Sequence, residues 1–253
     1  MSIEHLRHLI TSSSNLVCLM GLSVSMECGC LNYRQEDGLY DLEQKYGLSP
    51  EEIFSTGFYY TRPRQFFEFY QNEILNRTGE PDACLKTLGR MEQDGLIKAI
   101  ITRELFSLPK RAGCRNVIEL HGSIYDNACP RCQKAYSLDY MREGRPVPLC
   151  RTCGVPIRPN VCLMGQLVDS TRIFEAAKVL EEADTLLILG SHFESVLVDT
   201  CLPYFKGRQI ILINDREHLS DRNASYVLHQ KPADVIPLFY EETEAAQPMK
   251  ISC

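Results

Sequence analysis

Four cysteines in two close pairs are the clearest chemical pattern in this sequence. Cys129 and Cys132 are separated by two residues, as are Cys150 and Cys153, and seventeen residues lie between the pairs. A two-residue spacer lets a tight turn direct both sulfurs at one ion, and two such pairs complete a tetrahedral thiolate shell. This spacing predicts a structural zinc site, because four protein ligands leave no open position on Zn²⁺. The alternatives are coincidental spacing or two disulfides.

The eight remaining cysteines predict a different role, because most of them lie in apolar runs. We expect these to be small buried side chains. Cys28 and Cys30 follow the first apolar run, where a redox or nucleophilic role is the alternative to simple burial. The eight are Cys18, Cys28, Cys30, Cys84, Cys114, Cys162, Cys201 and Cys253.

Short apolar runs indicate the elements that must position these residues. Each run is rich in aliphatic or β-branched side chains at every position, which is typical of a parallel strand covered by helices on both faces. The predicted strands are Asn15–Met20, Ile97–Thr102, Asn116–Leu120, Thr185–Leu189 and Gln209–Asn214.

Helical patterns lie between these runs. Pro63–Leu75 carries an aromatic stripe, Asp82–Asp94 is followed by Gly95 as a stop signal, and Ser170–Ala183 has one apolar face. Alternating strands and helices predict an α/β fold, a Rossmann-like doubly wound parallel sheet. A ligand would bind at the carboxyl ends of the strands, in the loops that begin at Gly21, Thr102 and Gly190.

One stretch interrupts this alternation. Residues 125–159 are rich in Cys, Pro, Gly and Arg and show little periodicity, which predicts a small insert held by the zinc site. The expected division is therefore a discontinuous domain of residues 1–124 and 160–240, a four-cysteine zinc module at 125–159, and a flexible tail at 241–253.

The composition argues against several classes of partner. Lys and Arg number 27 against 33 Asp and Glu, a net charge of −6, so we expect no nucleic-acid ligand. No apolar run approaches the length of a signal peptide core or a membrane span, which predicts a cytoplasmic protein without membrane contact.

Several short motifs, taken in order along the chain, resemble the sirtuin family of NAD-dependent protein lysine deacylases. The resemblance covers about residues 15–238 and implies an NAD domain, a structural zinc module and an acyl-lysine protein or peptide as substrate. The motifs that carry it are Gly21-Leu22-Ser23-Val24-Ser25, Asn32-Tyr33-Arg34, Gly38-Leu39-Tyr40, Arg111-Ala112-Gly113, Asn116-Val117-Ile118-Glu119-Leu120-His121-Gly122-Ser123, Arg158-Pro159-Asn160-Val161, Met164-Gly165-Gln166, Gly190-Ser191-His192 and Leu212-Ile213-Asn214.

The resemblance also implies which residues contact NAD. His192 would contact a phosphate, and Ser23 replaces a glycine of the phosphate loop, where its hydroxyl can bond a phosphate. The other four histidines outside the matched motifs, His5, His8, His218 and His229, are expected at the surface. The expected NAD site is Gly21, Leu22, Ser23, Ser25, Arg34, Arg103, Glu104, Phe106, Gly190, Ser191, His192 and Asn214.

Two of these positions depart from the family pattern. Glu104 stands where sirtuins have the Asn that helps to order the ribose and a water. Phe106 stands where they have the Asp that holds the nicotinamide amide. A phenylalanine cannot accept the hydrogen bonds of that amide, and its ring can instead fill the nicotinamide pocket.

His121 is the candidate catalytic residue. The equivalent sirtuin histidine is a general base on a ribose hydroxyl, a task that suits imidazole because it titrates near neutral pH. The alternative is a histidine retained for packing or hydrogen bonding.

The substrate side is implied by a later segment. Val161, Met164, Gly165 and Gln166 would form one wall of the acyl-peptide cleft, where an extended peptide pairs through its backbone. Tyr70 would lie on the acyl side, and the alternative is an ordinary core aromatic residue. Glu73 stands where sirtuins that remove acidic acyl groups carry an arginine, which predicts no desuccinylase activity.

These features lead to two functional hypotheses. The first is a divergent NAD-dependent protein lysine deacylase of weak or altered activity. The second is a catalytically inactive module with the same fold that binds NAD, ADP-ribose or an acylated protein.

Overall fold

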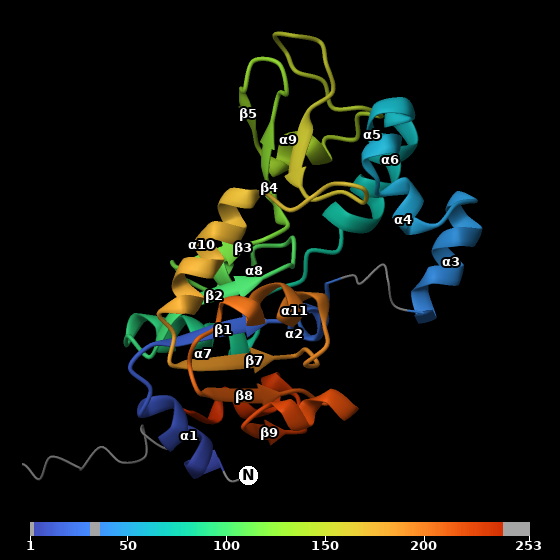
Figure 1. The fold of residues 1–253 in the computed structure, drawn as a ribbon. Coiled ribbons are helices and arrows are strands. Elements are labelled where there is room, and N and C mark those ends of the chain that lie inside the picture. Colours follow the sequence, from blue (N-terminus) through green and yellow to red (C-terminus); the bar gives the residue numbers. More distant parts are fainter. Residues whose placement is uncertain (1–2, 31–35, 240–253) are drawn as a thin grey trace, which may run out of the picture.

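The structure is a computed structural model that describes residues 3–30 and 36–239. Its larger part is a six-stranded parallel sheet in the order β3-β2-β1-β7-β8-β9 (Figure 1). This order reverses direction between β1 and β7, as in a doubly wound α/β fold. The strands are β1 (Leu16–Met20), β2 (Ile97–Thr102), β3 (Val117–Glu119), β7 (Thr185–Leu189), β8 (Gln209–Ile213) and β9 (Tyr226–Leu228).

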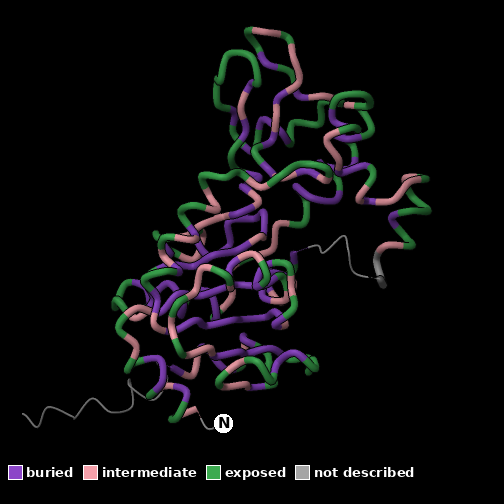
Figure 2. Tube along the Cα trace, viewed as in Figure 1, coloured by how far each residue is buried: buried purple, intermediate pink, exposed green. Residues whose placement is uncertain are grey.

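The two faces of this sheet are apolar, because alternate residues of each strand enter two separate cores. Leu16, Cys18 and Met20 of β1 pack into one core, while Val17 and Leu19 pack into the other. The central strands β1 and β7 are therefore buried along their whole length, whereas the edge strands β3 and β9 are mostly half-buried (Figure 2). All five predicted strands are confirmed.

The predicted helices are also present. α7 (Ala83–Gln93) begins at Asp82, whose carboxylate accepts a hydrogen bond of 2.9 Å from the Leu85 amide. α10 (Ser170–Glu181) covers the opposite face of the sheet. The segment 63–75 does not form one regular helix, because α6 (Pro63–Phe69) continues as the π-helix η1 (Tyr70–Leu75).

The other helices have between three and eleven residues. They are α1 (Ile3–Thr11), α2 (Leu22–Glu27), α3 (Glu36–Tyr46), α4 (Pro50–Ile53), α5 (Thr56–Thr61), α8 (Leu108–Arg111), α9 (Leu138–Arg142), α11 (Val196–Cys201), η2 (Leu202–Tyr204), η3 (Leu219–Asn223) and α12 (Pro232–Val235). Within the described residues, no helix combines the length and the apolarity that crossing a membrane requires.

A smaller antiparallel sheet lies at one end of the molecule (Figure 1). Its order is β5-β4-β6, formed by β4 (Gly122–Ala128), β5 (Ala135–Tyr136) and β6 (Arg158–Val161). Hydrogen bonds connect the segment 50–75 to this part of the chain: the Tyr59 hydroxyl donates to Pro156, and the Gln71 amide donates to Met141. The division into domains at residues 124, 159 and 240 stays a prediction, and the tail at 241–253 lies outside the described residues.

Candidate functional site

The four predicted zinc ligands come together in the smaller part of the molecule. The sulfurs of Cys129, Cys132, Cys150 and Cys153 all lie within 4.8 Å of one another, and those of Cys132 and Cys150 are 3.7 Å apart. Tetrahedral coordination at about 2.3 Å places sulfurs roughly 3.8 Å apart, so the four thiols fit a structural zinc site.

Backbone amides stabilise the thiolates of this cluster. The Cys132 amide donates to the Cys129 sulfur, and the Cys153 amide donates to the Cys150 sulfur. The Tyr136 hydroxyl also donates to Cys150, at 3.2 Å. These contacts orient the ligands in the way that outer-shell hydrogen bonds do in metal sites. No disulfide joins the cysteines within the described residues.

A cavity of about 980 Å³ opens at the carboxyl ends of the large sheet, beside the point where the strand order reverses. This is where ligands bind in open α/β sheets. It contains the predicted catalytic residue and every predicted NAD-site residue except Arg34, which lies outside the described residues. The lining includes Gly21, Leu22, Ser23, Ser25, Arg103, Glu104, Phe106, His121, Gly190, Ser191, His192 and Asn214.

Two glycines bring the ends of β1 and β7 into close contact at this cavity. The Gly21 amide donates to Leu189 at 2.8 Å, and a Cβ atom on Gly21 would lie 2.3 Å from the Gly190 carbonyl oxygen. Gly190 has a φ of +59°, a left-handed conformation that favours glycine. The sequence therefore needs glycine at both positions to form this edge of the cavity.

Three polar side-chain atoms of the lining are buried without a hydrogen-bond partner in the protein. They are Oγ of Ser25, Nδ1 of His192 and Oδ1 of Asn214. Buried polar atoms are nearly always paired, so a water molecule or a bound ligand is expected to complete these three. Ribose hydroxyls can donate or accept hydrogen bonds, and phosphate oxygens can accept them. A nucleotide therefore offers partners of the kind that these three residues need.

His121 lines the cavity and lies between β3 and β4 in the chain. Its Nε2 accepts a hydrogen bond of 2.9 Å from Nε of Arg103. An arginine cannot accept, so in this arrangement Nε2 is unprotonated and the imidazole is neutral. The His121 carbonyl accepts from the Cys162 amide at 2.8 Å, which fixes the backbone of the histidine against the segment after β6.

Glu104 stabilises the loop that follows β2. Its side chain is 1% exposed, and its two oxygens accept from the amides of Phe106 and Leu108. Burial is the main cause that raises the pKa of Glu104 to about 7, while the Phe106 amide opposes the rise. The carboxylate therefore acts as a cap at the start of α8, where Ser107 adopts a positive φ of 52° and makes no side-chain cap of its own.

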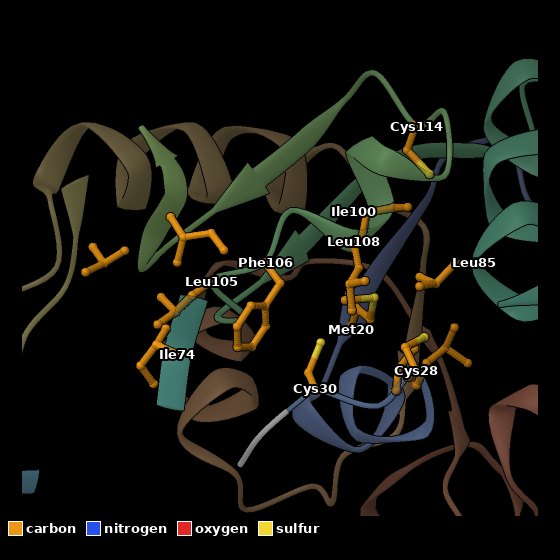
Figure 3. Packing of buried hydrophobic residues seen from close by; sticks show 14 of the residues in the cluster. Met20, Cys28, Cys30, Ile74, Leu85, Ile100, Leu105, Phe106, Leu108 and Cys114 are labelled. Carbon is orange, nitrogen blue, oxygen red and sulfur yellow. The ribbon is translucent and has the colours of Figure 1, made fainter. Parts of the chain in front are cut away.

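Phe106 forms part of an apolar wall of the cavity. Figure 3 shows its ring in a cluster with Leu105 and Ile74 on one side and Met20 and Cys30 on the other. The ring is 5% exposed and occupies the position where the sirtuin resemblance expects a carboxylate.

Cys28 and Cys30 belong to this packing and not to a reactive pair. Both are buried, and burial raises the pKa of Cys28 to about 11 and that of Cys30 to about 12. The Cys30 thiol donates to the Thr78 carbonyl at 3.2 Å. A thiolate, the nucleophilic form, is disfavoured at both positions near neutral pH.

The predicted substrate residues are not part of the cavity lining. Met164 pairs through its backbone with the segment 54–56, since its amide donates to Phe54 and its carbonyl accepts from Thr56. Gly165 and Gln166 are exposed beside it, and Val161 is buried in β6. Cys162, which the sequence reasoning placed among the buried cysteines, does line the cavity.

Tyr70 lies in the aromatic core. Its side chain is 0% exposed and its ring stacks on Phe54 and Phe66 at centroid distances of 6.0 and 5.7 Å. Neither Tyr70 nor Glu73 lines the cavity; Glu73 is buried and pairs with Lys45 at 2.6 Å. The position of Glu73 outside the cavity lining therefore gives no support to the prediction that the protein lacks desuccinylase activity.

Sequence reasoning missed several lining residues near the C-terminal strands. His218 is exposed, as predicted, and it also lines the cavity, where its ring stacks on that of His192 with 4.8 Å between ring centroids. Arg216 and Lys231 line it as well. Their position depends on how the chain returns after β8, for which no short motif gives a signal.

Comparison with known proteins gives consistent results. A family model described as the Sir2 family matches residues 21–197. An NAD-dependent protein deacetylase of Clostridium acetobutylicum is 33% identical over 235 residues, which are 92% of this chain and 96% of that protein. A protein of the same description from Clostridium tetani is 32% identical over 94% of this chain and 97% of its own length.

Solved structures extend this similarity to three dimensions. A Sir2 complex with a p53 peptide and NAD+ matches with a TM-score of 0.81 and 26% identity, covering 97% of this chain and 100% of that one. A Sir2 protein bound to an acetylated peptide matches with a TM-score of 0.80 and 25% identity, with the same coverage of both chains.

Proposed function

This chain belongs to the Sir2 family, and we propose that it is an NAD-dependent protein deacylase that acts on acyl-lysine in a protein or peptide. The observation that carries the proposal is the cavity at the ends of β1 and β7, which has two glycines at its edge that leave room for a nucleotide and has His121 in its lining. The relatives described as NAD-dependent protein deacetylases support this activity.

We propose that residues from two ends of the cavity hold the nucleotide. Gly21 and Gly190 allow the backbone to approach the phosphates closely, and Ser23 and Ser25 supply hydroxyls beside them. The side-chain oxygen of Asn214 has no hydrogen-bond partner in the protein, so it can accept a hydrogen bond from a ribose hydroxyl. When bound, NAD supplies a reactive glycosidic bond from which nicotinamide can leave.

His121 is the proposed general base. Its Nε2 is unprotonated because it accepts from Arg103, so it can take a proton from a ribose hydroxyl once that bond is exchanged. Arg103 contributes a donor that keeps the proton of the neutral ring on Nδ1 and orients the ring toward the cavity. The zinc cluster has no part in this chemistry, because its four thiolates are closed around their centre.

The proposed activity is weak relative to a sirtuin with the full motif. Phe106 offers no acceptor to the nicotinamide amide, and Glu104 uses its carboxylate on the backbone of its own loop. Fewer contacts then hold nicotinamide in a productive orientation, which lowers the population of reactive geometries.

The test is deacetylation of an acetyl-lysine peptide by the zinc-loaded protein, followed by mass spectrometry with and without NAD. We expect loss of the acetyl group only when NAD is present. An unchanged peptide at high protein concentration, from protein that binds ADP-ribose in calorimetry, would contradict the proposal.

That contradicting result would support a second function, an inactive binding module for ADP-ribose or NAD. The observation that favours it is the Arg103–His121 hydrogen bond, because it already occupies the nitrogen that the general base needs.

A further inference from the structure

We propose that Arg142, the last residue of α9, positions one wall of the cavity from outside it. Its side chain bonds to the last carbonyl of the π-helix η1, and η1 contributes Ile74 to the cavity lining. The inference rests on the proposed function in one respect, because it takes the cavity as the site where a nucleotide binds.

α9 and η1 satisfy each other's C-terminal carbonyls. The Arg142 guanidinium donates to the Leu75 carbonyl through Nε, at 3.1 Å, and through Nη2. In return, the Gln71 side-chain amide donates to the Met141 and Arg145 carbonyls, at 2.9 and 3.0 Å. The last carbonyls of a helix have no donor within the helix, so each side chain completes groups that the other element leaves unpaired.

η1 is the kind of element that needs such support. A π-helix is rare and occurs mostly as single turns within α-helices, frequently at functional sites. η1 continues α6 directly, so an α-helical path for the same residues is the competing arrangement. The two helix types rotate the chain by different angles per residue, and the side chains near the end of η1 would point in another direction in the α-helical form.

Ile74 is the residue through which η1 reaches the cavity. Its side chain is 1% exposed and lies beside Leu105 and Phe106, which line the cavity with it (Figure 3). Of the residues of η1, all of which the structure describes, only Ile74 belongs to the lining. Arg142 is not part of the lining, so it acts on the cavity through η1 and not through contact with a ligand.

The other side of this connection is fixed near the four-cysteine cluster. The Tyr140 hydroxyl of α9 donates to the Leu149 carbonyl at 2.6 Å, directly before the predicted zinc ligand Cys150. The Tyr140 ring also packs on that of Tyr136, with 4.7 Å between centroids, and the Tyr136 hydroxyl donates to the Cys150 sulfur. The cluster therefore holds α9, and α9 holds η1.

The experiment compares zinc-loaded full chains that carry Arg142→Gln or the matched control Arg145→Gln. The Arg145 side chain bonds to the Tyr140 hydroxyl and to Glu143, so the control removes an arginine whose contacts stay close to α9. We expect Arg142→Gln to increase hydrogen exchange in residues 70–77 and to weaken ADP-ribose binding roughly 2- to 30-fold, the usual range for a residue that acts on a site without touching it. The control should change neither.

Two further variants separate positioning from general loss of structure. Arg142→Lys keeps a donor and a positive charge at the end of η1, so it should recover part of the affinity. In a double-mutant cycle, Arg142→Gln should weaken ADP-ribose binding less in an Ile74→Ala background than in the wild type, because the side chain that it positions is already gone. Ile74→Val replaces the alanine variant if that variant does not fold.

Zinc content and thermal unfolding check that each variant is folded. If Arg142→Gln loses its zinc, Gln71→Met breaks the same connection from the side of η1 and takes its place. The inference is overturned if the folded variant leaves hydrogen exchange in residues 70–77 and ADP-ribose affinity unchanged, if Arg145→Gln has the same effect, or if the effects of Arg142→Gln and Ile74→Ala simply add.

The proposed function is judged separately by NAD-dependent deacetylation of a peptide by the wild-type protein. A wild-type protein that deacetylates, but whose Arg142→Gln variant binds ADP-ribose unchanged, keeps its function and loses only the inference. A wild-type protein that binds ADP-ribose and does not deacetylate loses the proposed function, while the response to Arg142→Gln still decides the inference.

Discussion

At the scale of single residues, the proposed function rests on His121 and on the two loop residues Glu104 and Phe106. His121, the proposed general base, accepts a hydrogen bond from Arg103 at Nε2, so this nitrogen carries no proton in that arrangement. Glu104 accepts hydrogen bonds from the backbone of the loop after β2, and Phe106 packs in the apolar wall of the cavity. The proposed chemistry therefore depends on the histidine, and the loop after β2 forms the wall beside it.

The role of His121 predicts the effect of removing its ring. His121→Ala should lower NAD-dependent deacetylation by roughly 10²–10⁴-fold, the usual contribution of a general base. The measurement is kcat/KM on an acetyl-lysine peptide, with ADP-ribose affinity as the control for an intact site. A variant that retains near wild-type kcat/KM would show that His121 is held for structure alone.

The glycine edge of the cavity gives a second prediction at this scale. Gly21→Ala would place Cβ 2.3 Å from the Gly190 oxygen and 2.6 Å from the Ser191 Cβ, so the ends of β1 and β7 must separate. We expect a loss of about 1–3 kcal/mol in stability and weaker ADP-ribose binding. Gly57→Ala is the matched control, because the nearest atom to its added Cβ is 3.8 Å away. Equal behaviour of the two variants would contradict this account of the edge.

At the scale of elements, two sets of local interactions fix segments of the chain. The loop 103–108 is capped by the Glu104 carboxylate, and the antiparallel strands β4–β6 are joined by the four-sulfur cluster. Neither set relies on a large apolar core of its own. The stability of the Glu104 loop should therefore depend on pH, and the stability of the β4–β6 region should depend on bound metal.

The raised pKa of Glu104 predicts a pH dependence of stability. An acid whose pKa is about 7 when folded and 4.5 when unfolded keeps its proton longer in the folded state. Its stabilising effect is complete below pH 4.5 and is lost as pH rises to about 7. The difference in unfolding free energy between wild type and Glu104→Gln should change by on the order of 3 kcal/mol across that range. Denaturant titrations at several pH values measure it, and a constant difference would refute the assignment.

Metal removal tests the role of the four-cysteine cluster. A chelator should release one zinc per chain and unfold the region of β4–β6, because metal binding supplies the folding energy of such modules. Hydrogen exchange should rise strongly in residues 125–159 and much less in the β1 and β7 strands. Cys132→Ser should weaken zinc retention, whereas Cys201→Ser, at a buried cysteine outside the cluster, should not. Full protection without metal would contradict a structural zinc role.

At the scale of the whole molecule, the doubly wound sheet brings together residues distant in sequence. Gly21, His121, Gly190 and Asn214 all reach one cavity because each follows a strand of the same parallel sheet. This is why the order of motifs along the chain was sufficient to predict twelve of the residues that line the cavity. Parallel strands end at one edge of the sheet, so residues that follow predicted strands must meet there.

Other parts of the fold could not be predicted from the sequence. β9 is only three residues long, and β4 has a mixed pattern of burial, so neither gave a clear apolar run. The π-helix at Tyr70–Leu75 continues the aromatic stripe with a different period, which a helical pattern does not distinguish. Met164 is engaged by the backbone of residues 54–56, a contact between distant segments that leaves no local signal.

The most direct test of the central claim is a single-turnover reaction of the zinc-loaded chain with NAD and an acetyl-lysine peptide. The account predicts that nicotinamide and deacetylated peptide appear together and in equal amounts, because one acyl group is transferred for each nicotinamide released. Intact NAD and an unchanged peptide, from protein that binds both, would contradict it. Nicotinamide release without loss of the acetyl group would contradict it as well, since it would show cleavage of NAD uncoupled from acyl-lysine.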